Sequence, residues 1–126
     1  MPVIIHVDHE RRRVVGTATG TLEDRDLFTY QEKAGRYEGY DEIFDGTAVE
    51  RLQDIHPATL MKLAGVAAAT DTEKPAKLAI VATQDVHFGM GRMYESFREC
   101  APNASRKLGI FHSREEAEQW LDANEE

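Results

Sequence analysis

The spacing of hydrophobic residues alternates along the chain between a strand pattern and a helix pattern, and together these patterns predict five strands and four helices. Runs of about four to eight residues rich in β-branched side chains predict strands. These runs cover residues 3–7, 14–21, 42–49, 76–83 and 106–112. Apolar residues spaced three or four positions apart predict the helices between them. The helical segments cover residues 21–37, 57–70 and 85–101, and a last helix follows Ser113.

The order of these segments predicts an α/β domain with the element order β-β-α-β-α-β-α-β-α. So few residues separate the first two strands that they must be antiparallel, because a parallel return needs a crossover. Strand and helix then alternate, which predicts a mixed sheet that is mostly parallel behind its N-terminal antiparallel hairpin. The run AKLAIVAT at 76–83 is typical of a central strand covered on both faces. We expect residues 1–126 to form a single domain.

Several residues mark the expected ends of the helices. Thr21 is the expected cap of the first helix, and Gly39 is expected to stop it near Tyr37. Pro57 suits the first turn of the second helix, and residues 113–116 form a capping box for the last one. On the third helix, the stripe predicted to face the core is Val86, Met90, Met93, Phe97 and Cys100.

Charge and composition exclude several classes of partner. The net charge is −8, from 23 acidic and 15 basic side chains. Such a field repels phosphate backbones and anionic lipids, so we expect no nucleic-acid partner and no membrane insertion. The one basic run, 11–13, is explained by a solvated hairpin tip. A single cysteine excludes an intramolecular disulfide, and the absence of a signal-peptide pattern at the N-terminus predicts a cytoplasmic location.

Three stretches carry a resemblance that covers nearly the whole chain. They are EIFDGTAV at 42–49 with the helix after it, AKLAIVAT at 76–83, and LGIFHSREEAEQWL at 108–121. With the element order, they resemble the SpoIIAA-like branch of the STAS superfamily, small bacterial proteins sometimes grouped with SEC14-type lipid-binding folds. The resemblance implies a SpoIIAA-like fold. The best-known members of the superfamily are anti-sigma-factor antagonists.

The chain departs from those antagonists at their regulatory serine. The antagonists carry a phosphorylated serine at the start of the helix after the third strand, in an Asp-Ser-Ser-Gly-Leu context. The matching stretch here is His-Pro-Ala-Thr-Leu at 56–60, which places Ala58 at that position and the hydroxyl of Thr59 one residue later. The resemblance therefore implies a STAS-type module without this phosphorylatable serine. It also implies that the start of this helix, from His56 to Thr59, faces a partner.

The helix over 57–70 is apolar on nearly every side, and such a helix is buried on more than one side. One interpretation is that neighbouring helices of the same domain cover it. The other is contact with a second chain or an apolar ligand. Because the helix has more apolar surface than one sheet face needs, we expect a homodimer through residues 57–70.

Polar residues at the carboxyl ends of the predicted strands are the second candidate site, because ligands of parallel α/β sheets gather there. The sequence places Asp45, Asp85 and His112 at these ends, and His56 just beyond the third strand. With Thr59, these are the candidate partner- or ligand-binding residues. The alternative is ordinary loop chemistry, in which Asp85 caps its helix.

No pattern in the sequence predicts catalysis, a cofactor or a metal site, since the five histidines lack tight ligand spacing. We therefore expect a non-enzymatic regulatory or protein-interaction module. The alternative function is a carrier or sensor of a small apolar ligand or lipid. Its pocket would be lined by residues that otherwise belong to a plain core, namely Met61, Phe88, Met90, Met93, Tyr94 and Phe97.

Overall fold

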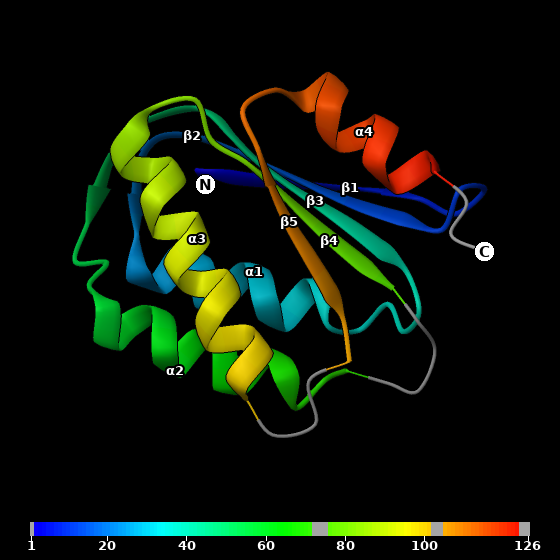
Figure 1. The fold of residues 1–126 in the computed structure, drawn as a ribbon, viewed down its shortest axis with the longest axis horizontal. Helices are drawn as coiled ribbons and strands as arrows, with labels where there is room; N and C mark the ends of the chain where they lie inside the picture. The colour runs from blue at the N-terminus through cyan, green and yellow to red at the C-terminus, as the bar shows by residue number, and fades with distance from the viewer. Residues whose placement is uncertain (1, 72–75, 102–104, 124–126) are drawn as a thin grey trace.

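The computed structural model describes residues 2–71, 76–101 and 105–123, which form one five-stranded sheet with helices on both faces (Figure 1). The element order is the predicted one. The elements are β1 (Val3–Asp8), β2 (Arg13–Glu23), α1 (Asp24–Ala34), β3 (Asp41–Gln53), α2 (Pro57–Ala68), β4 (Lys77–Val81), α3 (Asp85–Cys100), β5 (Lys107–Phe111) and α4 (Arg114–Asp122).

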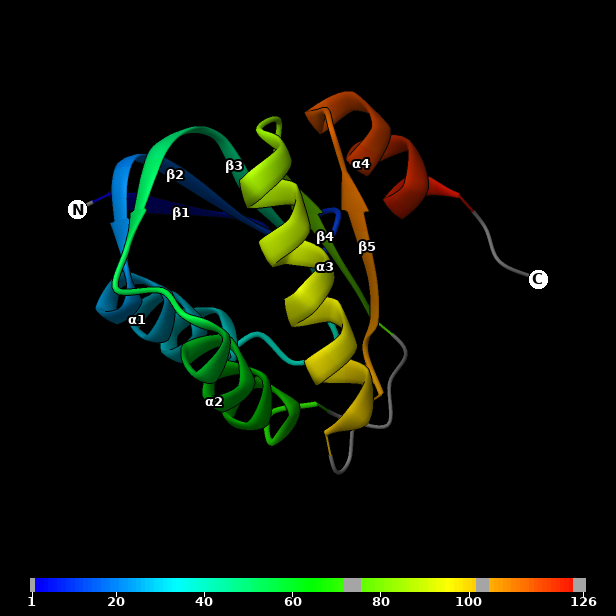
Figure 2. The ribbon, with the colours of Figure 1, turned by 60° about the vertical axis from the view of Figure 1, so that its left-hand side comes forward.

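The strands lie in the order β1-β2-β3-β4-β5. β1 and β2 are antiparallel, and each later pair is parallel, as the sequence predicted. Parallel crossovers are right-handed, so a sheet that grows in one direction carries its crossover helices on a single face. Accordingly, α1, α2 and α3 cover one face, and α4, which follows the last strand, covers the other (Figures 1 and 2).

Two apolar clusters follow from the alternation of side chains along the strands. Val14 and Ala18 of β2 are fully buried beneath the three crossover helices. Val15, on the opposite face of the same strand, belongs to the smaller cluster under α4 with Ala117 and Leu121. The two faces of β2 thus contribute to two separate clusters.

β3 is longer than the predicted segment 42–49. Its second half pairs in parallel with the end of β2, with Thr21 opposite Arg51 and Leu22 opposite Leu52. The sequence predicted no strand over residues 50–53, and this was wrong. Polar residues form a strand here because a neighbouring strand supplies the backbone hydrogen bonds, whatever the local composition.

The same pairing shifts the start of α1. Thr21 remains in β2, so the cap is Glu23, which forms a reciprocal capping box with Asp26. The helix ends at Ala34 rather than near Tyr37. Gly39, the predicted stop, lies in the following connection with a positive φ of 74°, a conformation that glycine adopts without strain.

The inward side of α3 includes three of the five residues of the predicted stripe, since Met90, Met93 and Phe97 are partly buried against the core. The two ends of the stripe were predicted wrongly, because Val86 is 72% exposed and Cys100 is exposed. Tyr94 and Arg98 are buried instead, and an ion pair with Asp71 holds Arg98 inside. Among the described residues, no helix combines the length and apolar character needed to cross a membrane.

Candidate functional site

An apolar cavity of about 120 Å³ lies between the sheet and the three crossover helices. Leu60 and Leu63 of α2 line one side, and Ile80 of β4 lines another. Gly91 of α3 and Ala82, just after β4, also line it. The side chains that line this space do not fill it.

The polar side chains in the cavity wall include Tyr30 of α1 and Glu42 of β3. The Tyr30 hydroxyl donates a hydrogen bond to Glu42 Oε1 over 3.1 Å. Burial, and then the neighbouring carboxylate, raise the pKa of the Tyr30 phenol well above its usual value. The cavity wall therefore presents a neutral phenol bonded to a buried carboxylate.

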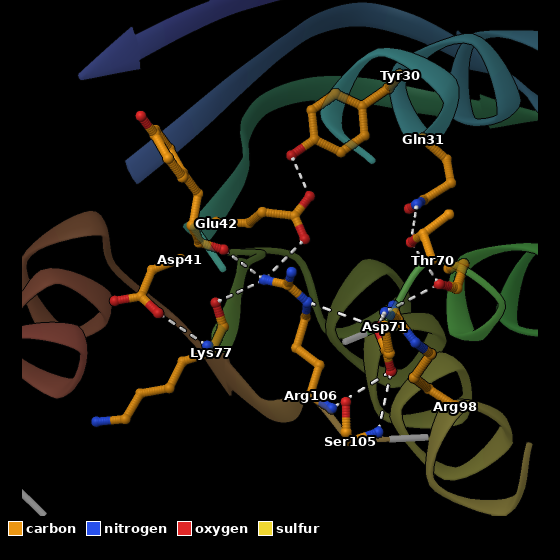
Figure 3. A network of polar contacts seen from close by, with 12 residues as sticks. Tyr30, Gln31, Asp41, Glu42, Thr70, Asp71, Lys77, Arg98, Ser105 and Arg106 are labelled. Carbon is orange, nitrogen blue, oxygen red and sulfur yellow. Dashed lines mark hydrogen bonds and ion pairs between the residues drawn. The ribbon is translucent and has the colours of Figure 1, made fainter. Parts of the chain in front are cut away.

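Glu42 belongs to a larger polar network that runs below the cavity (Figure 3). Its Oε2 lies 3.3 Å from Arg106 Nη1. Arg106 Nε in turn lies 3.8 Å from Asp71 Oδ1, and the same oxygen lies 2.6 Å from Arg98 Nη2. Arg98 Nη1 donates to the hydroxyl of Tyr94 over 2.9 Å. The negative charges of two carboxylates thus balance the positive charges of two guanidinium groups. The phenols of Tyr30 and Tyr94 lie at the two ends of this network.

Asp71 is the junction of this network. Its side chain is 1% exposed, and its Oδ2 accepts bonds from the backbone N–H groups of Ser105 at 3.1 Å and Arg106 at 3.3 Å. It therefore ties the chain just after α2 to the start of β5 and, through Arg98, to the end of α3 (Figure 3). Carboxylate–guanidinium hydrogen bonds are stronger than neutral ones, so this pair holds the three backbone segments in place.

The outer face of α2 is the second feature of interest. Five residues on the inner side are buried, namely Leu60, Leu63, Ala64, Ala67 and Ala68. On the outer side, Met61 is 58% exposed and Val66 is 46% exposed, with Gly65 and Ala69 also exposed. Its own domain therefore covers one side of this apolar helix, as the first interpretation expects, and leaves an apolar side in solvent. Contact of that side with a second chain or a ligand stays a prediction.

The structure places His56 and Thr59 together at the start of α2. Thr59 Oγ1 accepts a bond from the His56 backbone N–H over 3.2 Å and donates to the Asp54 carbonyl over 3.4 Å. His56 is the N-cap residue of the helix. These contacts show that both residues help to begin the helix. They lie beside the exposed face of α2.

The three residues at the strand ends do not converge. Asp45 Oδ1 accepts from the backbone N–H of Thr47 at 2.9 Å and from its hydroxyl, and Oδ2 pairs with Arg114 at 3.3 Å. His112 stacks on Phe88, with ring centroids 4.1 Å apart. Asp85 is exposed at the first position of α3. Within the described part of the chain, no hydrogen bond or ion pair links Asp45, Asp85 and His112.

None of the five candidate residues lines the cavity, and of the six residues named for an apolar pocket only Met90 and Tyr94 do. Sequence reasoning missed Tyr30, Glu42 and Asp71. A glutamate at the start of an otherwise buried strand was the one available signal. In the described ranges, no three metal-ligating side chains form a group that could hold an ion.

Comparison with solved structures identifies a related fold. An uncharacterized protein of the DUF3478 family from Shewanella loihica, described as having a SpoIIAA-like fold, superposes with a TM-score of 0.59. The two sequences are 17% identical over 94% of this chain and 91% of that chain. No protein-family model matches the chain, and no curated protein does. The chain thus has a SpoIIAA-like fold, as its sequence predicted.

Proposed function

We propose that the chain is a non-enzymatic, STAS-type protein-interaction module whose contact surface is the outer face of α2. The supporting observation is the exposure of Met61 and Val66 on a helix whose inner side is already packed. Gly65 and Ala69 are small residues on the same exposed side. They allow a second helix to approach closely, because the distance between packed helices depends on the side chains at the contact.

The charge on α2 and on the whole chain indicates which kind of partner fits this surface. Lys62 is the one charged residue of α2, in a chain with a net charge of −8. An apolar partner helix with an acidic residue opposite Lys62 gains an ion pair there, whereas a second copy of α2, which has no acidic residue, meets this face through its apolar residues alone. The homodimer through 57–70 stays a prediction. It also stays a prediction that the chain, with Ala58 at the position of the antagonists' serine, lacks their phosphorylation switch.

Site-specific photo-crosslinking tests this surface. A photoreactive amino acid at position 61 or 66, in cells that produce the protein, should give one discrete adduct that mass spectrometry identifies. The same residue at Val86, which is 72% exposed on α3, is the matched control and should give none. A self-adduct from 61 and 66 supports the homodimer, whereas equal adducts from all three positions contradict a specific α2 surface.

A second function, the binding of a small apolar ligand, is favoured by the cavity. Its 120 Å³ is close to the ~150 Å³ of an engineered apolar cavity that binds benzene. It is below the ~300 Å³ at which drug-sized pockets begin, so a lipid with long acyl chains does not fit. The matching ligand is compact and apolar, with one polar group facing the Tyr30–Glu42 pair.

Native mass spectrometry of freshly purified protein, followed by calorimetric titration with indole and phenol, tests this second function. Ala82→Leu is the diagnostic variant, because Ala82 lies on the cavity side of the sheet with Leu78 and Ile80 and a larger side chain fills the space. Ligand binding should disappear in this variant while the chain stays folded. No binding by the unmodified chain, or equal binding by both, contradicts the ligand function.

A further inference from the structure

The outer edge of β1 is an open hydrogen-bonding surface. β1 is the end strand of the sheet and, among the described residues, pairs with β2 alone. The Thr19 backbone N–H donates to the Pro2 carbonyl over 2.8 Å, so Pro2 and Thr19 form a hydrogen-bonded pair. Hydrogen-bonded and non-hydrogen-bonded pairs alternate along an antiparallel ladder. The N–H and C=O groups of Val3, Ile5 and Val7 therefore point away from β2, towards solvent.

This edge lacks the features that usually prevent a strand from pairing with another chain. Such features are lysines, prolines within the strand, bulges and very short edges. β1 reads VIIHVD over six residues and pairs with β2 without a register shift. The opposite edge strand, β5, is five residues long and begins with Lys107. Ile4, in the middle of β1, is 67% exposed.

We propose that β1 pairs with β1 of a second copy of this chain, antiparallel and centred on Ile5, to give one continuous sheet. The strand is complementary to itself in this register. Ile5 exchanges both of its backbone bonds with Ile5 of the second copy, and Val3 exchanges bonds with Val7 of the second copy. In each copy, all six outward-pointing backbone groups of β1 then form hydrogen bonds, namely the N–H and C=O groups of Val3, Ile5 and Val7.

The side chains of β1 fit the same register. Ile4 lies directly opposite His6 of the second copy in a non-hydrogen-bonded pair, the arrangement in which side chains approach most closely. The one acidic residue of the strand, Asp8, lies opposite Pro2 of the second copy. Two chains of net charge −8 therefore meet without a carboxylate facing a carboxylate.

The groove beside β1 supports the same two-fold arrangement. A surface hollow of about 220 Å³ lies between β1 and α1 and is lined by Val3, Ile5, Asp26, Thr29, Tyr30 and Lys33. Asp26, Thr29 and Lys33 share one side of α1 at helical spacing. The two-fold axis sets the two α1 helices antiparallel across the new sheet, with Asp26 of one copy towards Lys33 of the other. This contact is independent of the α2 surface proposed above.

Sedimentation equilibrium with a matched pair of lysine variants tests the proposal. Ile4→Lys and Val66→Lys each replace an exposed apolar side chain by the same charge, the first on β1 and the second on α2. The unmodified chain should be dimeric at about 100 µM, a concentration that suits an interface of modest area. Ile4→Lys should weaken the dimer about tenfold or more, and Val66→Lys should leave it unchanged.

Disulfide crosslinking tests the register itself, in chains that also carry Cys100→Ser. Residues 4 and 6 of opposite copies form a direct pair within disulfide reach, whereas residues 4 and 4 are diagonal neighbours roughly 7–8 Å apart. A mixture of Ile4→Cys and His6→Cys chains should therefore form crosslinked dimers on oxidation, and neither chain alone should do so.

Three results overturn the proposal. One is a chain that stays monomeric at about 100 µM, which leaves the edge for another protein's strand. Another is a dimer that survives Ile4→Lys but is lost in Val66→Lys, which assigns self-association to α2 and supports the homodimer through 57–70. The third is crosslinking of either cysteine variant alone as fast as the mixture, which indicates unspecific edge contacts.

Discussion

Removing the Asp71 carboxylate should destabilise the fold more than any change on its surface. In Asp71→Ala, Arg98 keeps its contacts to the Tyr94 hydroxyl and the Ala67 carbonyl but loses its close counter-charge at 2.6 Å. The Arg98 side chain is 2% exposed, so solvent cannot replace that charge. Breaking a buried ion pair by removing one partner costs about 3–5 kcal/mol.

That cost is a large share of the total stability of a domain, which is about 5–15 kcal/mol. Urea unfolding followed by the fluorescence of Trp120 measures it, and the slope with denaturant should stay constant. The double variant Asp71→Ala/Arg98→Met should be more stable than Asp71→Ala by about 2 kcal/mol, because it removes the unpaired charge as well.

An exposed ion pair provides the control. Glu32 near the end of α1 and Arg36 just beyond it lie 3.3 Å apart, with side chains 73% and 69% exposed. Glu32→Ala should cost about 0.3–0.5 kcal/mol. A loss below about 1 kcal/mol for Asp71→Ala, or a double variant no more stable than the single one, refutes the view that the network holds α2, α3 and β5 together.

Three further predictions rest on single contacts. Burial raises the pKa of Tyr30 and of Tyr94 above the usual value, so at alkaline pH the folded state keeps protons that the unfolded chain releases. The free energy of unfolding should therefore fall above about pH 10. Absorbance at alkaline pH should show that both phenols ionise only when the chain unfolds. Gly16→Ala puts a Cβ into the ring of Tyr30 and should cost about 1–3 kcal/mol in urea titrations. Ser113→Ala removes the cap that accepts from the Glu116 N–H and should lower the melting temperature by the equivalent of about 1 kcal/mol.

Much of this fold could be predicted from the sequence because its signals are local. The short turn after Asp8 fixes the antiparallel pair, and the capping box at Ser113 fixes the last helix. Other features depend on contacts between distant residues. The end of β3 is a strand because β2 lies beside it, and no local pattern in 50–53 contains that information.

The candidate site illustrates the same limit. Arg98 reads as a solvated position on α3, and its burial follows from a carboxylate 27 residues away in the sequence. The cavity is lined by residues of separate elements, among them Gly91 and Ala82, which come together only in the folded chain. The polar residues at the strand ends were visible in the sequence, but Asp45 is explained by its bond from Thr47 and His112 by its stacking on Phe88.

The two proposed binding functions share one helix, and this has a thermodynamic consequence. Leu60 and Leu63 on the inner side of α2 line the cavity, whereas Met61 and Val66 on its outer side meet solvent. A ligand in the cavity and a partner on the outer face therefore act on the same rigid element, whose C-terminal end Asp71 anchors. If one ligand changes the affinity of the other, the second must change the affinity of the first by the same factor. Asp71→Ala loosens that anchor, so it should alter crosslinking from position 66 and ligand binding together, and a change in only one of them contradicts a shared element.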